Sequence, residues 1–466
     1  MKAFSAGKAA LNFILILATV LAAAPSTASA GQGPAIASPS AMLIEESTGK
    51  VLYAVNENEK MYPASMTKLI TGIVALDYLD PDEIVLVGNE VYRVPDDSSK
   101  AGHKAGESIT VENLLRGLFM QSGNESGVIL AVNAVRKMRG DYNISYSESE
   151  KIFCDLMNEK AVEVGAVSSH FVNPHGYHDP YHYTTASDML KIAADFMKHP
   201  ILRQIVAEKS YRGNSLGGMD SVPGGLMTQE YSWESHNDLL LDGENHYDLA
   251  TGIKTGYTSQ AGYCLVSSAV KNGMTLFAVV FNDPEPERWK DTVAMFEYGF
   301  ANFRFETVLA KGEPIDRLAV SDPRLGGETE MDIYAAEGFA GLYSDEERGR
   351  VTREVAYDRG VLSAEGELKT PVARGEVLGS VSLALDGEVI FTADAVAGAE
   401  ALERTNQTDK EYKSEQFRSF VFSAGAVPYW IGAAVLFVAL VVAAVFLIRS
   451  RMNRNKSYYK LNKRYF

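Results

Sequence analysis

The stretch YPASMTKLI, Tyr62–Ile70, places a serine three positions before a lysine, where a turn leads into an apolar segment. The helix expected here, SMTKLITGIVALDYL, is apolar on nearly all faces, which indicates that it is buried. With Ser65 in the first turn and Lys68 about one turn later, the two side chains would share a face. Serine needs a base to become a nucleophile, and lysine is that base only when desolvation or a second cation lowers its pKa. The stretch therefore predicts an active serine, with a helix-capping role for Ser65 as the alternative.

The Ser-x-x-Lys pattern alone is weak, because this chain contains four further pairs: Ser5/Lys8, Ser47/Lys50, Ser268/Lys271 and Ser457/Lys460. The first and last lie in a predicted signal peptide and a predicted cytoplasmic tail. The other two lie at a predicted turn and at the end of a predicted strand, where no helix aligns the side chains. Position in the chain therefore favours Ser65 and Lys68.

Two further motifs strengthen this choice. Ser122-Gly123-Asn124 interrupts the two helices expected over VENLLRGLFMQSGNESGVILAVNAV, although a second Ser-x-Asn, Ser235-His236-Asn237, makes this motif weak alone. Lys254-Thr255-Gly256 occurs once, just before a predicted hairpin. Its lysine would supply a second cation, and Gly256 leaves room for the backbone of a ligand. The order and spacing of the three motifs predict one active site.

Residues 31–303 alternate predicted strands and helices. AMLIEESTGKVLYAVNENE predicts two strands around Ser47-Thr48-Gly49, and GYCLVSSAVKNGMTLFAVVFND predicts a hairpin around Asn272-Gly273. WKDTVAMFEYGFANF then predicts an amphipathic helix. Strands at both ends of this region with helices between them predict a mixed α/β (α+β) domain, with an antiparallel sheet between helices.

The pattern of apolar and polar residues changes after this region. Residues 304–397 consist of short alternating runs, with a hairpin signal at Asp386-Gly387, and predict a small all-β sandwich domain. Residues 398–424 lack core-forming side chains and are expected to be a polar stalk.

The two ends of the chain predict its topology. Residues 1–30 have the pattern of a secretory signal peptide with an Ala28-Ser29-Ala30 cleavage site, and an uncleaved anchor is the alternative. Residues 425–448 are expected to form a transmembrane helix, because the stretch Tyr429–Ile448 has twenty residues without a charge, about the length needed to cross a membrane. Residues 449–466 carry seven Lys or Arg and no acidic residue, which places this tail in the cytoplasm and the folded domains on the extracytoplasmic side of the cell membrane.

Charge and cysteine content exclude some classes of protein. Residues 31–448 carry a net charge of −25, because the tail contributes +7 and the signal peptide +2 to the total of −16. Such an acidic body argues against binding to nucleic acid. Only two cysteines occur, Cys154 and Cys264, which rules out a disulfide-rich scaffold but leaves open whether they pair. Cys264 lies in a predicted core strand and is expected to be a buried apolar residue.

Together the three motifs resemble those of the serine penicillin-recognising enzymes. More narrowly, the chain resembles the low-molecular-mass penicillin-binding proteins of the D-alanyl-D-alanine carboxypeptidase type. That resemblance covers most of residues 40–303 and rests on YPASMTKLITGIVAL, MQSGNESGVILAVNAV, FVNPHGYHDPYHYTTASDML, SHNDLLL and GIKTGYTSQAGYCLVSSAVKNGM. The chain departs from the family at Tyr257, where relatives often have histidine, and in its full transmembrane helix, where many relatives use an amphipathic one.

The resemblance implies a penicillin-binding/β-lactamase-like transpeptidase fold and a role for each motif. Ser65 would attack the carbonyl between two D-alanines of a peptidoglycan stem peptide and form an acyl-enzyme. Lys68 would be the base, Ser122 would relay a proton to the leaving amine, and Asn124 would hold Lys68 and the substrate amide.

The same resemblance assigns the substrate-binding side of the site. Lys254 would lower the pKa of Lys68 and bind the substrate carboxylate together with Thr255. The backbone N–H groups of Ser65 and Tyr257 would form the oxyanion hole. Arg288 is expected to contact the same carboxylate, and a solvated surface arginine is the alternative.

Several other functions compete with this one. The histidines His175, His178 and His182 could suggest zinc, but Pro and Gly residues make their segment a loop, and we expect no metal and no cofactor. β-Lactams are expected to acylate Ser65 and inhibit the enzyme. A β-lactamase would need a deacylating glutamate, for which Glu159 and Glu163 are available. A D,D-endopeptidase, a transpeptidase and a non-enzymatic wall-peptide-binding module are the remaining alternatives.

Overall fold

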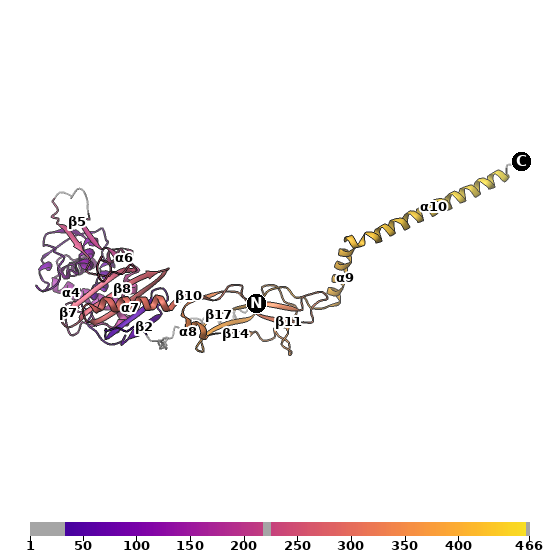
Figure 1. The fold of residues 1–466 in the computed structure, drawn as a ribbon. Coiled ribbons are helices and arrows are strands. Elements are labelled where there is room, and N and C mark those ends of the chain that lie inside the picture. Colours follow the sequence, from indigo (N-terminus) through magenta and orange to yellow (C-terminus); the bar gives the residue numbers. More distant parts are fainter. Residues whose placement is uncertain (1–32, 218–224, 463–466) are drawn as a thin grey trace, which may run out of the picture. The chain divides into compact units, whose positions relative to one another are not determined.

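The computed structural model describes residues 33–217 and 225–462, and the predicted signal peptide lies outside these residues. The chain divides at Arg304 into two compact units, residues 1–304 and residues 305–466. Figure 1 shows helices and strands of both units.

The first unit is built on a five-stranded antiparallel sheet. Its strand order is β2-β1-β9-β8-β7, so β7 lies at an edge. The bounds of its strands are β1 (Ser40–Glu45), β2 (Val51–Val55), β7 (Ala250–Thr258), β8 (Gly262–Lys271) and β9 (Met274–Asp283). Asn272 and Gly273 join β8 to β9 with φ angles of 51° and 82°, as the type I′ turn predicted from this dipeptide requires.

Helices cover both faces of this sheet. The helix α7 (Glu287–Asn302) packs on one face, where Leu43 and Leu276 lie against Gly299. Met42 and Ile44 alternate with Leu43 and point to the other face, where they join the main hydrophobic core. The helices of that core and of the segments around it are α1 (Lys68–Leu76), α2 (Val111–Met120), α3 (Asn124–Arg139), α4 (Tyr146–Glu163), α5 (Ala186–Phe196) and α6 (Pro200–Ala207). The predicted antiparallel sheet between helices is confirmed (Figure 1).

The helix expected from Ser65 onward is in fact two elements. A single 3₁₀ turn, η1 (Ala64–Thr67), precedes α1, which begins at Lys68. Eight of the nine residues of α1 are buried, as the apolar pattern predicted. The 3₁₀ start was missed because a local sequence pattern does not distinguish i→i+3 from i→i+4 hydrogen bonding over one turn.

Short two-stranded pairs and a second 3₁₀ helix complete the first unit. They are β3 (Ile84–Leu86) with β4 (Ser108–Thr110), β5 (Ser210–Asn214) with β6 (Glu230–Glu234), and η2 (Asn89–Tyr92). Cys154 in α4 and Cys264 in β8 are both buried and unbonded to each other. Cys264 has no exposed surface, and burial raises the pKa of its thiol to about 12, so it behaves as the apolar core residue that was predicted.

The second unit begins with a β-rich region. Its larger sheet has the order β14-β16-β17-β12-β11-β15, and β10 pairs with β13. The bounds are β10 (Phe303–Leu309), β11 (Pro314–Ser321), β12 (Glu330–Ala335), β13 (Phe339–Ser344), α8 (Asp345–Arg350), β14 (Val351–Tyr357), β15 (Leu368–Lys369), β16 (Val377–Leu385) and β17 (Glu388–Ala397). Asp386 and Gly387 form the tight turn between β16 and β17 with φ angles of 52° and 85°, which confirms the predicted hairpin.

Two helices follow the β-rich region. The segment expected as a polar stalk contains α9 (Asn406–Val421), which has no buried residue and begins with a capping box between Thr405 and Thr408. After η3 (Ala424–Ala426) comes α10 (Val427–Asn462). Within the described residues, Ala424–Arg454 is the one stretch of helix long and apolar enough to cross a membrane.

Candidate active site

The turn η1 brings Ser65 and Lys68 together. Residues i and i+3 are eclipsed in a 3₁₀ turn, and Lys68 Nζ lies 2.9 Å from Ser65 Oγ. No side chain caps η1, whose N-cap is Pro63, so the structure gives Ser65 no capping role. Ser65 is half-buried, and it lines the pockets described below.

Lys68 is fully buried and has three hydrogen-bond partners. Besides Ser65, its Nζ lies 2.7 Å from Asn124 Oδ1 and 2.6 Å from the backbone oxygen of His175. Burial lowers the pKa of Lys68 well below its usual value, the charge of Lys254 lowers it further, and Glu125 opposes the shift. A neutral lysine amine has two N–H donors and one lone pair. The two oxygen acceptors satisfy the donors, which leaves the lone pair for the hydroxyl proton of Ser65.

The Ser-x-Asn motif lies where α2 ends and α3 begins. Ser122 has a φ of 54°, an unusual conformation for a non-glycine residue, and Asn124 is the first residue of α3. Both side chains are about 5% exposed. The structure therefore brings Asn124 to Lys68 as expected, and Ser122 lines the larger pocket beside Ser65.

Lys254, Thr255 and Gly256 lie on the edge strand β7. Lys254 Nζ donates to the backbone oxygen of Thr255 at 3.0 Å, and burial together with the nearby Arg288 lowers the pKa of Lys254 to about 7. A Cβ on Gly256 would lie 2.8 Å from the oxygen of Pro63 and 3.3 Å from the nitrogen of Ser65. Gly256 thus makes room for the backbone of η1, which lets the turn that carries Ser65 lie against β7.

Arg288 lies in the larger pocket and not on a solvated surface. Its side chain is 12% exposed, and its guanidinium lies 4.7 Å from the ring centre of Tyr263. Tyr263 in turn contacts the ring of Tyr257 at 4.6 Å. The only ion pair of Arg288 among the described residues is a long one, 3.9 Å to Glu285, and its buried Nε has no hydrogen-bond partner. The guanidinium is therefore available to an anion.

The loop around His175 is a part of the site that the sequence did not reveal. Pro174 and His175 present backbone oxygens to Thr71 and Lys68, and the Cβ of any other residue at Gly176 would overlap the carbonyl oxygen of Ala64. Gly176 also has a φ of 83°. This segment contributed to the family resemblance and its histidines raised the question of zinc, but neither assigned a role to the loop backbone, which makes the contacts.

Two histidines of this loop, His175 and His182, have hydrogen-bond partners within the protein. His182 Nε2 lies 2.7 Å from Thr67 Oγ1 and its Nδ1 accepts the N–H of Val172, while burial lowers its pKa to about 3. Within residues 33–217 and 225–462, no three His, Cys, Asp or Glu side chains are arranged to hold a metal ion.

Two pockets meet at Ser65. The smaller has a volume of about 420 Å³ and lies between the His175–His178 loop, residues 97–99 and the end of β7. The larger, about 870 Å³, is lined by Ser122, Thr255 and Arg288. Ser235 and His236 of the second Ser-x-Asn also line the larger pocket, so that segment is a wall of the cleft.

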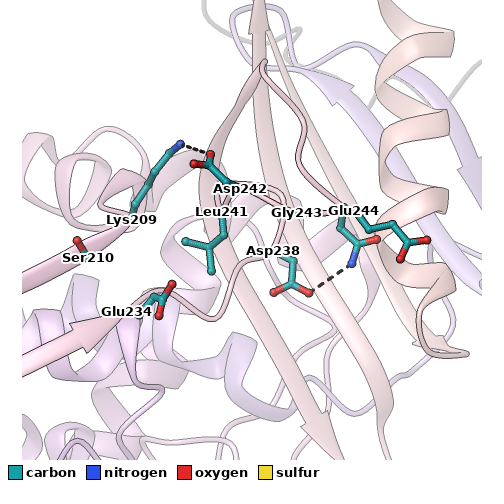
Figure 2. A pocket seen from close by; sticks show the side chains of 9 residues that line it. Lys209, Ser210, Glu234, Asp238, Leu241, Asp242, Gly243 and Glu244 are labelled. Atoms are coloured by element: carbon teal, nitrogen blue, oxygen red, sulfur yellow. Dashed lines mark hydrogen bonds and ion pairs between the residues drawn. The ribbon is translucent and has the colours of Figure 1, made fainter.

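A third pocket of about 390 Å³ adjoins the larger one and shares Glu234, Asp238 and Leu241 with it. Figure 2 shows its acidic side chains, with Lys209 directed toward Asp242. Asn245 Nδ2 donates to Asp238 Oδ2 at 3.4 Å. This part of the cleft is strongly acidic and therefore disfavours an anionic group of a ligand.

The rival residues lie elsewhere. Ser47 hydrogen-bonds to Glu45 in the turn between β1 and β2, and Ser268 hydrogen-bonds to Thr251 within the sheet. The side chains of the pairs near the two chain ends lie outside the described residues. Glu159 and Glu163 are exposed on α4 and line neither pocket beside Ser65.

Comparison with known proteins identifies the family to which the chain is similar. Residues 26–285 match the D-alanyl-D-alanine carboxypeptidase family. The D-alanyl-D-alanine carboxypeptidase DacF of Bacillus subtilis is 28% identical over 84% of this chain and 94% of its own length, and DacD of Salmonella typhimurium is 30% identical over 80% and 89%. Among solved structures, penicillin binding protein 5 of Haemophilus influenzae has a TM-score of 0.55 and 27% identity, covering 80% of this chain and all of that one. The Streptomyces K15 DD-transpeptidase has a TM-score of 0.52 and 28% identity, covering 58% of this chain and all of that one.

Proposed function

The chain belongs to the D-alanyl-D-alanine carboxypeptidase family, and from this premise we propose that it removes the terminal D-alanine from peptidoglycan stem pentapeptides through an acyl-enzyme on Ser65. The observation that carries the proposal is the contact between Lys68 Nζ and Ser65 Oγ at 2.9 Å, with Lys68 fully buried. No cofactor is required for this chemistry.

Acylation begins when Lys68 takes the hydroxyl proton of Ser65. The oxygen of Ser65 then attacks the carbonyl carbon between the two D-alanines, and the resulting oxyanion is stabilised by the backbone N–H groups of Ser65 and Tyr257. Ser122 relays the proton from Lys68 to the nitrogen of the leaving D-alanine as the C–N bond breaks, which returns Lys68 to its neutral form. Water later hydrolyses the ester on Ser65 and releases the shortened peptide.

Binding of the substrate follows from the edge position of β7. An unpaired strand edge accepts an extended peptide through backbone hydrogen bonds. Arg288 and Thr255 line the larger pocket and would bind the terminal carboxylate, and the buried Lys254, whose Nζ lies 3.4 Å from Thr255 Oγ1, would add a second positive charge behind Thr255. The smaller pocket would then hold the acyl part of the stem peptide.

β-Lactams would acylate Ser65 by the same step, because their amide carbonyl takes the place of the peptide carbonyl. Turnover of the drug by a β-lactamase route is disfavoured, since Glu159 and Glu163 do not line the pockets beside Ser65. Endopeptidase and transpeptidase activity on the same peptides remain the second candidate, since both use the same acyl-enzyme.

Membrane attachment is proposed through α10. The apolar stretch Ala424–Arg454 would cross the cell membrane once, with the catalytic unit on the extracytoplasmic side and the basic tail in the cytoplasm.

The test uses the full chain in detergent micelles with a stem pentapeptide that ends in D-Ala-D-Ala. Free D-alanine, cross-linked dimer and penicillin hydrolysis are followed together. We expect release of D-alanine, slow penicillin turnover and a stable penicillin adduct, all lost in Ser65→Ala. Ser47→Ala, from a rejected Ser-x-x-Lys pair, is the matched control and should behave as wild type.

Each alternative has its own outcome in this experiment. Fast penicillin hydrolysis would identify a β-lactamase, and cross-linked dimer in excess of the hydrolysed tetrapeptide would identify a transpeptidase. Absence of both D-alanine release and the penicillin adduct would leave only a peptide-binding module.

A further inference from the structure

A buried polar relay lies behind the Ser-x-Asn motif. It consists of Glu107, Tyr231 on β6, His103 and Ser126 on α3, and none of these side chains is more than 7% exposed. None of them lines the two pockets beside Ser65. The chemistry assigned above leaves this relay without a role, although it starts two residues after Asn124.

The direction of each hydrogen bond in the relay follows from its acidic end. Glu107 accepts from Ser215 Oγ, from Gln229 Nε2 and from the hydroxyl of Tyr231. Because a carboxylate only accepts, Tyr231 donates to it and is free to accept from His103 Nδ1 at 2.8 Å. The hydrogen of His103 is therefore on Nδ1, and its Nε2 accepts the hydroxyl of Ser126 at 2.9 Å.

This arrangement requires a neutral imidazole, because a charged one would donate from both nitrogens. Burial lowers the pKa of His103, against the opposing charges of Glu125 and of Glu107, whose carboxylate lies 3.9 Å from Nδ1. At neutral pH all hydrogen bonds of the relay therefore run in one direction, from the hydroxyl of Ser126 toward the carboxylate of Glu107.

The relay packs directly against the catalytic turn. A Cβ on Gly123 would lie 2.7 Å from Ser126 Oγ and 2.8 Å from the Cβ of Ala101, so the turn has no space in which to shift. The segment Ser99–His103 is bound to the start of α3, where Asn124 donates to Ser99 and Gly102 donates to Glu125.

The other side of this segment is bound to β6. Trp233 Nε1 donates to the backbone oxygen of Ala101 at 3.1 Å, beside the contact of His103 with Tyr231. The segment Ser99–His103 is thus held between β6 and α3, and Ser99 itself lines both pockets.

We propose that His103 and Tyr231 are positioning residues for acyl transfer, which hold the segment Ser99–His103 against α3 and thereby place Ser122 and Asn124 relative to Lys68. The proposal rests on the proposed function only for its activity readout. The positive φ of Ser122 makes external support necessary, because such a conformation persists only where the surroundings enforce it.

The kinetic test compares Tyr231→Phe with Tyr247→Phe in the full chain. Tyr247 is the matched control, because its hydroxyl also donates to a glutamate, Glu297, at 2.6 Å in the same unit. For Tyr231→Phe we expect kcat for D-alanine release to fall about 10- to 100-fold, the typical effect of a misplaced catalytic group, while KM changes less than about twofold. Tyr247→Phe should keep both constants.

A second measurement needs no variant. In the full chain labelled with ¹⁵N-histidine, the nitrogen spectrum should report His103 as the Nδ1–H tautomer at neutral pH. If these residues served only the stability of the fold, Tyr231→Phe would lower the unfolding temperature and leave kcat unchanged. That result, or an Nε2–H tautomer of His103, would overturn the proposal.

The two proposals fail differently. If the wild-type chain released no D-alanine but was still acylated by a fluorescent penicillin, the acylation rate would replace kcat in the comparison. If it did neither, the proposed function would fail, while the tautomer measurement would still decide whether the relay exists in the inferred direction.

Discussion

Lys68 illustrates how a single residue acquires its chemistry from its surroundings. Its hydrogen-bond partners come from three parts of the chain: Ser65 in the same turn, Asn124 from α3 and His175 from the loop after α4. Together these partners hold the amine in one orientation. Burial and the charge of Lys254 lower the pKa of Lys68 and so keep the amine neutral. Position and protonation are therefore determined by residues that a Ser-x-x-Lys pattern does not contain.

Replacing Lys68 by methionine should abolish acylation while preserving the fold. The base is lost, so the rate of acylation by a labelled penicillin should fall by about 10² to 10⁴, the usual contribution of a general base. Lys271→Met is the control, since it makes the same change in another Ser-x-x-Lys pair. Retention of more than a tenth of the wild-type rate in Lys68→Met would contradict the assigned role.

Lys254 predicts a pH dependence of substrate capture. Burial lowers the pKa of Lys254 to about 7, so the free enzyme loses this charge as the pH rises through that value. A substrate with a free carboxylate should then bind more weakly, and kcat/KM should decline above pH 7. The decline of kcat should begin at higher pH, because a bound carboxylate favours the charged lysine.

The variant Lys254→Arg tests this cause. An arginine stays charged throughout the range, so the decline of kcat/KM between pH 7 and 9 should disappear even if the maximum is lower. A wild-type profile that is level from pH 6 to 9 would refute the prediction.

At the scale of elements, the site is an assembly of three turns around one helix end. The turn η1 carries Ser65, the turn between α2 and α3 carries Ser122, and the loop at Gly176 lies against both the oxygen of Ala64 and Lys68. Two glycines allow this close packing: Gly256 faces η1 from β7, and Gly176 faces it from the loop.

Gly176→Ala should remove activity and stability together. Its φ of 83° disfavours a side chain, and the new Cβ would overlap Ala64, which would displace η1. Gly140→Ala is the matched control, because Gly140 has a φ of 65° but no atom within 4 Å of the added Cβ. We expect the control to cost about 1 to 2 kcal/mol of folding free energy from backbone strain alone and to keep its acylation rate.

Thermal unfolding and the rate of penicillin acylation, measured on both variants, test whether the loop at Gly176 positions η1. Equal acylation rates in the two variants would show that the loop does not position η1.

The turns and helix boundaries also show which features a local sequence pattern can predict. The hairpins at Asn272-Gly273 and Asp386-Gly387 were predicted because two residues with positive φ suffice to specify such a turn. The 3₁₀ turn before α1 was not, since its hydrogen bonding depends on how Pro63 and Ala64 pack against β7. The helix α9 was likewise missed, because a polar composition by itself signals neither a helix nor its absence.

At the scale of the whole molecule, buried charge affects the stability of the catalytic unit. Asp283 at the end of β9 and Asp291 on α7 are each about 95% or more buried, and Asp291 also accepts the backbone N–H groups of Ala37 and Ser38. Asp291 thus joins the N-terminal segment to α7. Burial, and then the charge of Asp291, raise the pKa of Asp283 far above its usual range.

The contribution of Asp283 to the stability of this unit should therefore decrease as the pH rises from about 4 toward the raised pKa. The folded chain keeps a proton on Asp283 that the unfolded chain releases near pH 4, so the stabilisation is complete below pH 4 and declines toward the raised pKa. In Asp283→Asn the denaturation midpoint should change less between pH 5 and 8 than in wild type. Asp82→Asn, at an exposed position, should leave the wild-type slope intact, and an unchanged slope in Asp283→Asn would refute the assignment.

The membrane-spanning role of α10 leads to a prediction by truncation. A chain that ends at residue 423 lacks the apolar stretch Ala424–Arg454 and should be recovered in the soluble fraction after alkaline extraction. A chain that ends at residue 454 keeps this stretch and should stay in the membrane pellet. Membrane retention of the shorter chain would place the anchor elsewhere.

The sequence by itself determined the catalytic motifs, both hairpins and the apolar C-terminal helix, because each depends on residues close together in the chain. The antiparallel sheet between helices was predicted from the order of strands and helices, but its pairing of β1 with β9 joins segments from opposite ends of the unit. The opening stretch, Tyr62–Ile70, was enough to distinguish Ser65 from four rival serines once its position before a buried helix was considered.

Only the tertiary structure decided how the motifs work together. The bond from Lys68 to the oxygen of His175 spans 107 positions, and that from His103 to Tyr231 spans 128. The placement of Arg288 inside the cleft and of Gly256 beneath η1 depends equally on packing between distant segments. Such contacts leave no local pattern, because their partners are chosen by the folded backbone and by the desolvation of the groups that it buries.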